Sequence, residues 1–248
     1  MPDRDPDSVN FPPFETEDLR SNLARFLDTP FTDPTGGTRK VGNYKWGVYA
    51  FFDYDGEPIY VGQTNEMLRT RVRRHLTNQR TDAVAMSVLD PFEVYEIEVW
   101  PLPELQGVSK PRERSGPRWD AWLAAVDTLN CLERAVHDRA IEASQFQAIL
   151  NEKDPPPAKA EVEPPPSLRA CVVSPEVYAI RSHPDFRNAR RALIISRLAQ
   201  VIAERKVQGG LRRVLLTQAK RLQWLAQRRY DALGGAASVE QGGEDEDV

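Results

Sequence analysis

The chain has 248 residues, which is enough for one domain of ordinary size with an appendage or for two small domains. Charged residues make up 28% of it and the mean hydropathy is -0.54, values typical of a soluble protein, and no apolar run is long enough to cross a bilayer. The net charge of -4 argues at first against nucleic acid as a partner.

The net charge conceals a strong segregation along the chain. Residues 169–233 carry 14 basic and 4 acidic side chains, a net charge of +10. The tail, residues 234–248, carries 5 acidic side chains and no basic one. A basic segment inside an acidic protein is typical of a surface that phosphate backbones select. A solvated helix face is the alternative interpretation.

The N-terminus and the cysteines indicate a compartment. The first residues are acidic and polar, unlike a secretory signal. The two cysteines, Cys131 and Cys171, are too few for a disulfide framework or a four-ligand zinc site. We therefore expect a reducing cytoplasm.

Residues 1–43 are predicted to form an N-terminal arm with one short helix. Acidic residues from Glu15 onward suit the first turn of that helix, and its apolar residues recur at helical spacing. Residues 28–43 are rich in turn-forming residues and are predicted to be a loop.

Residues 44–151 are predicted to form a mixed domain. The aromatic and β-branched run from Gly47 favours a strand, the Asp55-Gly56 pair a hairpin turn, and residues 59–62 a second, antiparallel strand. A basic helix over residues 67–76, a third strand over 92–100 and a long helix over 119–143 follow.

The remainder divides into three segments. Residues 152–168 are so rich in proline that they indicate a semi-rigid linker. Residues 169–233 are predicted to be a basic helical module, with a strand or loop over 170–180 and helices over 185–207 and 211–233. The joint at Gly209-Gly210 favours an antiparallel helical hairpin. Residues 234–248 are predicted to be an acidic, disordered tail.

Several residues of the mixed domain suit phosphate chemistry. Tyr49 and Tyr60 lie on strands predicted to pair, so their rings can approach one another. Gly62 ends a strand, at a point where the backbone must pass close to another group. Arg71 and His75 are four positions apart and therefore share one face of a helix. Two tyrosines, an arginine and a histidine near a strand end are suited to a phosphate oxyanion.

These residues resemble the motifs of the GIY-YIG nuclease superfamily. Its two tripeptides are represented by Gly47-Val48-Tyr49 and Tyr60-Val61-Gly62, and its Leu-x-x-Arg by Leu68-Arg69-Thr70-Arg71. Residues 44–151 carry the resemblance, which is specific because its features occur together and in order. The resemblance implies an α+β fold: a small antiparallel sheet flanked by helices, followed here by an α-helical C-terminal hairpin.

The resemblance also implies roles for particular residues. Tyr49 would position or deprotonate the attacking water, Tyr60 would hydrogen-bond the scissile phosphate, and Arg71 would stabilise charge on phosphorus. A tyrosine base needs a nearby cation, because its ordinary pKa is near 10. The alternative is that both tyrosines only pack a half-buried strand face.

Three further positions complete the expected site. Glu133 would bind a single Mg²⁺ or Mn²⁺ ion, with Glu142 and Asp138 as competing candidates. Asn151 would close the domain and join the catalytic set. A histidine four positions after the arginine, here His75, resembles the GIY-YIG restriction endonucleases, as does the N-terminal segment from Asn10 to Leu19.

Arginines outside this set are candidates for DNA binding. They lie on the predicted basic helix and on the C-terminal hairpin, and their alternative role is to keep a packed hairpin soluble. The candidates are Arg69, Arg73, Arg74, Arg190, Arg191, Arg212 and Arg213.

The sequence thus predicts a metal-dependent DNA endonuclease, with a restriction or anti-phage defence role as the first hypothesis. A repair or structure-specific nuclease and an inactive DNA-binding or scaffold subunit are the alternatives. DNA is the expected partner and no membrane is expected. Cutting a palindrome on both strands would call for a homodimer.

Overall fold

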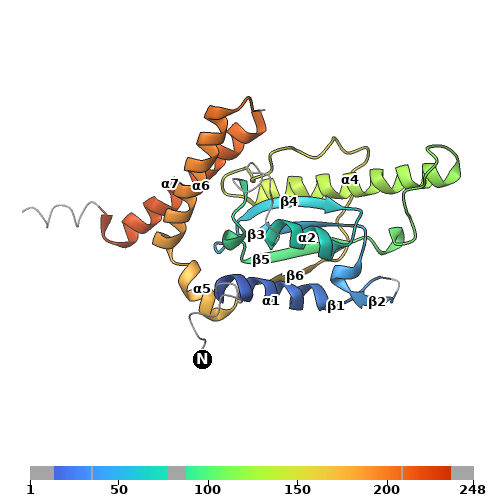
Figure 1. The fold of residues 1–248 in the computed structure, drawn as a ribbon, viewed down its shortest axis with the longest axis horizontal. Coiled ribbons are helices and arrows are strands. Elements are labelled where there is room, and N and C mark those ends of the chain that lie inside the picture. The colour runs from blue at the N-terminus through green and yellow to red at the C-terminus, as the bar shows by residue number, and fades with distance from the viewer. Residues whose placement is uncertain (1–13, 35, 78–87, 208, 236–248) are drawn as a thin grey trace, which may run out of the picture.

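The computed structural model describes residues 14–34, 36–77, 88–207 and 209–235, so most of the predicted acidic tail and residues 1–13 lie outside the described residues. The fold is α+β, as predicted (Figure 1). A four-stranded antiparallel sheet has helices on both faces, and a helical hairpin stands at one end of it. No helix within the described ranges is long and apolar enough to cross a membrane.

The sheet is built around the predicted hairpin. Strands β3 (Gly47–Phe52) and β4 (Pro58–Thr64) pair antiparallel, and β5 (Glu96–Pro101) and β6 (Leu168–Cys171) complete the order β4-β3-β5-β6. Every residue of β3 is buried, because the strand has a neighbour on each side and a helical layer on each face.

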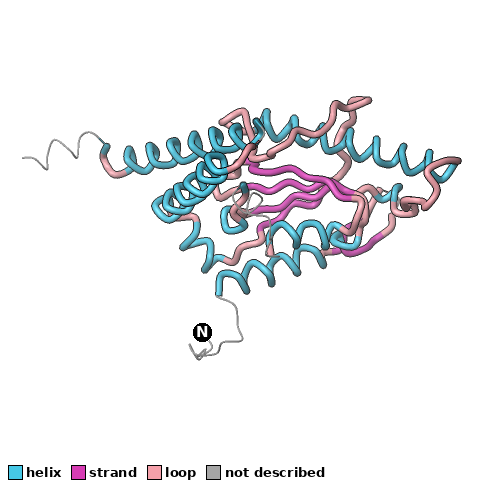
Figure 2. The backbone as a smooth tube through the Cα atoms, turned by 45° about the horizontal axis from the view of Figure 1, so that its top comes forward, coloured by secondary structure: helices cyan, strands magenta, loops and turns pink. Residues whose placement is uncertain are grey.

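Two helical layers cover the sheet. One face packs against α1 (Phe14–Asp28) and α2 (Leu68–Leu76), and the other packs against α4 (Pro117–Ala143). Alternation along β3 sends Tyr49 and Phe51 to the first layer and Val48 and Ala50 to the second. Figure 2 shows α4 continuing well beyond the sheet at its N-terminal end.

The structure departs from the prediction in three local elements. A hairpin of β1 (Pro30–Thr32) and β2 (Thr38–Lys40) occupies part of the expected loop. The third strand of the prediction starts late, because the Asp90 side chain caps a 3-10 turn at Pro91–Glu93. Helix α5 (Pro175–Arg181) replaces an expected strand or loop. Short 3-10 turns also occur at Val41–Asn43 and Pro103–Leu105.

The proline-rich segment does not separate the C-terminal part from the sheet. It packs along α4, where Lys159 pairs with Asp127 at 2.7 Å and Arg139 with Glu163 at 2.5 Å. Strand β6 then joins the sheet edge beside β5. Helices α6 (Pro184–Glu204) and α7 (Gly209–Ala232) form the predicted hairpin. The division into separate domains therefore stays a prediction.

Buried ion pairs attach this hairpin to the turn between β3 and β4. Asp53, 1% exposed, accepts hydrogen bonds from Arg187 at 3.1 Å, from Arg191 at 2.9 Å and from Arg221 at 2.5 Å. Glu93 also accepts from Arg191, at 3.1 Å. Three cations from two helices thus converge on carboxylates of the mixed domain.

This network corrects the expected DNA-binding role of Arg191. Its side chain is 3% exposed and its charge is already paired, so it cannot contact a phosphate in this structure. Arg190 pairs with Asp90 at 2.7 Å, and Arg213 with Asp154 at 2.7 Å. The high positive charge of residues 169–233 is therefore largely used to hold the hairpin against acidic partners.

Candidate active site

The two motif tyrosines share one face of the sheet. In the β3–β4 register Tyr49 lies opposite Gly62 and Tyr60 lies opposite Phe51, which makes the tyrosines diagonal neighbours. Their ring centroids are 6.3 Å apart. The sequence predicted this approach from strand pairing, and the structure confirms it.

Gly62 is the point of close approach that the sequence indicated. A Cβ atom at this position would lie 2.5 Å from the Tyr49 hydroxyl oxygen and 2.7 Å from its Cζ atom. Such distances are shorter than any ordinary contact, so a side chain here would displace the tyrosine. Glycine allows the Tyr49 ring to lie directly over the backbone of β4.

Helix α2 brings Arg71 and His75 to the hydroxyl of Tyr49. The Arg71 Nε–H group donates to that oxygen at 3.3 Å, and the His75 Nε2 atom lies 2.9 Å from it. A guanidinium can only donate, so the tyrosine oxygen accepts from Arg71. Between Tyr49 and His75, the tautomer of the imidazole determines which group donates.

A polar cavity of about 420 Å³ opens beside these residues. Its wall includes Tyr60, Arg71 and His75, together with Glu133 from α4, but Tyr49 lies behind the wall and is fully buried. Burial raises the pKa of Tyr49 far above its ordinary value, with the neighbouring Tyr60 adding to the effect and Arg71 opposing it. The structure thus revises the expectation that Tyr49 itself holds the attacking water.

Glu133 reaches the cavity from the opposite helical layer because β4 is an edge strand. Next to it, Gln63 of β4 donates to Asn130 of α4 at 2.9 Å, which fixes the helix against the strand. Glu133 is half-buried and makes no hydrogen bond or ion pair with the described residues. Burial raises the pKa of Glu133 to about 7, against the attraction of Arg71.

The competing carboxylates lie elsewhere on α4. Glu142 is exposed, and Asp138 pairs with Arg134 at 2.8 Å. Of the three candidates only Glu133 lines the cavity.

One protein-family model matches the part of the chain that contains strands β3 to β5 and helix α2. Residues 45–112 match the family model described as the GIY-YIG catalytic domain. Over these residues the chain carries a GIY-YIG catalytic domain, which indicates a nuclease-type hydrolase. The match covers both tripeptides, α2 and β5, while Glu133 and Asn151 lie beyond it. No curated protein and no solved structure matches the chain.

GIY-YIG nucleases generally use a divalent metal ion, so it matters whether the cavity offers ligands for such an ion. Across the described ranges no group of three or more His, Cys, Asp and Glu side chains could hold an ion. Glu133 nevertheless fits as a single protein ligand, because it is a hard oxygen donor, unpaired and held in a polar cavity. A cation beside it would offset the burial that raises its pKa.

The Asn151 side chain holds the edge of β4. Its Oδ1 atom accepts from the Val61 N–H group at 3.0 Å, and its Nδ2 atom donates to the Val61 carbonyl at 2.7 Å. The side chain therefore stands in for a neighbouring strand at the free edge of β4. Asn151 therefore positions β4, and because it also lines the cavity its catalytic role stays a prediction.

The arginines of α2 that were predicted to bind DNA differ in their ion pairs. Arg69 pairs with Asp28 at 2.6 Å and joins α2 to α1, whereas Arg74 pairs with Glu66 at 2.9 Å. Arg73 is half-buried and has no ion pair among the described residues. Lys153 also lines the cavity and was not predicted from the sequence, because it lies in an irregular segment with no periodic pattern.

Proposed function

We propose that this chain is a divalent-cation-dependent DNA endonuclease, acting in the cytoplasm in restriction or anti-phage defence. One observation carries the proposal. The Tyr49 hydroxyl contacts both Arg71 and His75 at the wall of a polar cavity that also contains the unpaired carboxylate of Glu133. The GIY-YIG match supports the nuclease part of the proposal.

The reaction is hydrolysis of a phosphodiester. Water attacks phosphorus and a new P–O bond forms, while the bond from phosphorus to one deoxyribose oxygen breaks in line with it. The leaving oxygen takes a proton from solvent and becomes a hydroxyl group. Arg71 stabilises the charge that builds on the phosphate oxygens, and Tyr60, which also lines the cavity, hydrogen-bonds the phosphate. Glu133 would hold Mg²⁺ or Mn²⁺, which would supply further charge neutralisation at the phosphate.

His75 takes the proton of the water on its Nδ1 atom, in the tautomer whose Nε2–H group donates to the Tyr49 oxygen. Tyr49 is kept neutral by its burial, so it is a poor base alone. His75 lies on the cavity wall and within hydrogen-bond distance of the tyrosine oxygen, 2.9 Å away. Histidine is the side chain best suited to exchange a proton near neutral pH. Tyr49 therefore orients His75 and Arg71 with a single oxygen atom.

The likeness of the Arg71–His75 pair to GIY-YIG restriction endonucleases favours the defence role. A restriction enzyme that cuts both strands of a palindrome needs two active sites related by a two-fold axis, so we propose a homodimer for that activity.

The proposal is tested by incubating plasmid DNA with Mg²⁺ or Mn²⁺. We expect wild type to cut, and both Arg71→Ala and Glu133→Ala to lose at least ~100-fold in rate. Arg197→Ala, which changes an exposed arginine of α6, is the matched control and should cut normally.

The products separate the alternatives. Fragments of reproducible length support restriction, whereas cleavage confined to branched or damaged DNA supports repair. Wild type that binds DNA but is as inert as the variants on every substrate would refute the nuclease proposal and leave a binding or scaffold role.

A further inference from the structure

The cations of the C-terminal hairpin divide into two groups. Nine of the 14 basic residues in 169–233 have a carboxylate partner, and most of these partners belong to the rest of the chain. The paired ones are Arg169, Arg181, Arg187, Arg190, Arg191, Arg213, Arg221, Arg228 and Arg229. These cations already have acidic partners, so a phosphate would have to compete with a carboxylate for each of them.

The other five cations are exposed and have no ion pair with any described residue. They are Arg197, Arg205, Lys206, Arg212 and Lys220. Three of them, Arg205, Lys206 and Arg212, flank the joint between α6 and α7, and we call these three the tip cations. Exposed cations without a carboxylate partner are the ones that can exchange counterions for a phosphate backbone.

The joint between the two helices is fixed against the cavity wall. Gly210 lies so close to Glu152 that a Cβ atom at this position would collide with the Glu152 carbonyl oxygen. In the same turn of α7, Arg213 donates to the Asn151 carbonyl at 3.3 Å and pairs with Asp154. Glu152 and Lys153 line the cavity, so the joint that carries the tip cations adjoins the cavity wall.

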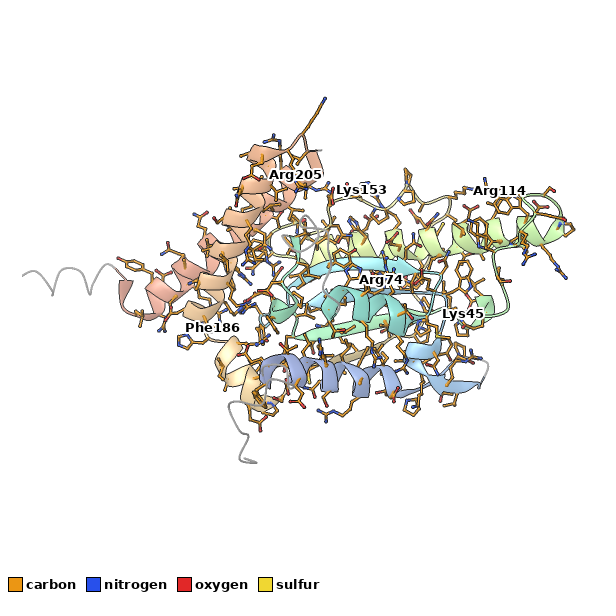
Figure 3. All side chains as sticks on the ribbon, viewed as in Figure 1. Lys45, Arg74, Arg114, Lys153, Phe186 and Arg205 are labelled. Carbon is orange, nitrogen blue, oxygen red and sulfur yellow. The ribbon has the colours of Figure 1, made fainter. Side chains whose placement is uncertain are left out.

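Figure 3 shows this arrangement, with Arg205 at the end of the hairpin and Lys153 close to it. Few carboxylates lie near the tip cations. Asp154 is paired with Arg213. Glu204, which accepts a hydrogen bond from the neutral Gln200 at 2.8 Å and keeps its charge, and Glu152 in the cavity wall are the other acidic groups near the joint.

We propose that the tip cations and Lys153 bind the phosphates of DNA that flank the phosphate held in the cavity. The inference rests on the proposed function, because it takes the cavity as the place where a DNA strand is cut. It moves the expected DNA contact from the paired arginines of α6 to the end of the hairpin. Of the hairpin arginines first predicted to bind DNA, Arg212 alone belongs to this surface.

A second set of exposed cations offers a competing surface and a matched control. Lys110, Arg112, Arg114 and Arg118 lie around the projecting N-terminal end of α4, where Figure 3 shows Arg114. Arg118 precedes Glu133 by fifteen residues, about 22 Å along a helix. A short DNA duplex centred on the cavity would therefore not reach this set.

The experiment compares two triple variants of the full chain, each in a Glu133→Gln background that prevents cleavage. One is Arg205→Ala/Lys206→Ala/Arg212→Ala, and the control is Lys110→Ala/Arg112→Ala/Arg114→Ala. Binding to a fluorescent duplex of about 10 base pairs, roughly 34 Å long, is followed by anisotropy over a range of KCl concentrations. Thermal unfolding shows that each variant is folded.

The tip variant should bind at least ~10-fold more weakly, and the slope of log K against log salt should fall by about two to three. The control should keep the affinity and slope of its parent. Equal affinity of the tip variant and its parent, or a larger loss in the control, overturns the inference alone. If the parent itself fails to bind DNA, the proposed function fails with it.

Discussion

At the scale of single residues, burial acts differently on the two ionisable groups that matter most. Tyr49 has no exposed surface, and its raised pKa keeps it neutral between Arg71 and His75. Glu133 has a pKa of about 7 and stands in a polar cavity, where a cation can reach it. The first group is therefore a fixed hydrogen-bonding centre, and the second is a ligand whose charge depends on pH near neutrality.

The Glu133 carboxylate should destabilise the metal-free protein at alkaline pH. Its folded-state pKa of about 7 lies above the ordinary value of 4.5, so its protonated form favours folding. The contribution of Glu133 to the free energy of unfolding should fall as pH rises from about 4.5 to 7 and should then level off. Glu133→Gln removes that loss, so its Tm without metal should exceed that of wild type at pH 8 and equal it near pH 4.

Glu142→Gln is the matched control, because Glu142 lies on the same helix and is exposed. It should unfold like wild type at each pH. Added Mn²⁺ should raise the Tm of wild type at pH 8 but not that of Glu133→Gln. A Glu133→Gln variant that is less stable than wild type at pH 8 without metal would contradict the assignment.

At the scale of secondary-structure elements, the site depends on how closely β4 approaches the side chains of β3. Gly62 leaves room for the Tyr49 ring, and Asn151 satisfies the backbone of Val61 at the edge where no further strand pairs. The edge position of β4 in turn lets Glu133 approach from α4. The proposed catalytic groups thus meet because β4 is an edge strand and has a glycine opposite Tyr49.

Gly62→Ala tests this requirement. The added methyl would contact the Tyr49 hydroxyl and ring, so the tyrosine must move away from Arg71 and His75. We expect a loss of about 1–3 kcal/mol in unfolding free energy and a greater than ~10-fold loss in cleavage rate. Denaturant unfolding and plasmid cleavage measure the two effects.

Gly107→Ala is a suitable comparison, since a Cβ atom at Gly107 meets nothing within 4 Å. It should leave both stability and cleavage near the wild-type values. Normal cleavage by Gly62→Ala would show that the position of the Tyr49 hydroxyl is not critical.

At the scale of the whole molecule, the C-terminal hairpin is part of the folded body of the protein. Its arginines pair with Asp53, Glu93, Asp90 and Asp154, and β6 leads into it from the sheet. A chain shortened before β6 would leave Asp53 and Glu93 buried without cations, so simple deletion cannot test DNA binding by this region. Single substitutions are required.

Arg191→Met separates the structural role from the DNA-binding role first predicted for this residue. Methionine keeps much of the volume but leaves Asp53 and Glu93 with one cation fewer in a buried setting. Removing one partner of a buried ion pair costs about 3–5 kcal/mol, so we expect a marked fall in Tm. The measurement is thermal or denaturant unfolding.

Arg197→Met on the exposed side of the same helix should unfold like wild type. An Arg191→Met protein with unchanged stability and weakened DNA binding would restore the original interpretation of Arg191.

Local sequence determined the elements and most of the site. Residue alternation and the Asp55-Gly56 turn predicted the β3–β4 hairpin, and helical periodicity predicted α2, α4 and the C-terminal hairpin. Because strand pairing and helical spacing are short-range geometry, they sufficed to bring Tyr49 to Tyr60 and Arg71 to His75. The GIY-YIG likeness rested on the same short-range patterns.

Only the tertiary structure decided which of these groups face the cavity and which cations are free. Tyr49 lies behind the wall, Asn151 is engaged by Val61, and Arg191 is buried against Asp53. Each of these outcomes depends on a partner at least 50 positions away or on how the layers enclose a side chain, and neither is a local property. Charge counted along the sequence could not show that most of the hairpin's cations were already neutralised across the fold.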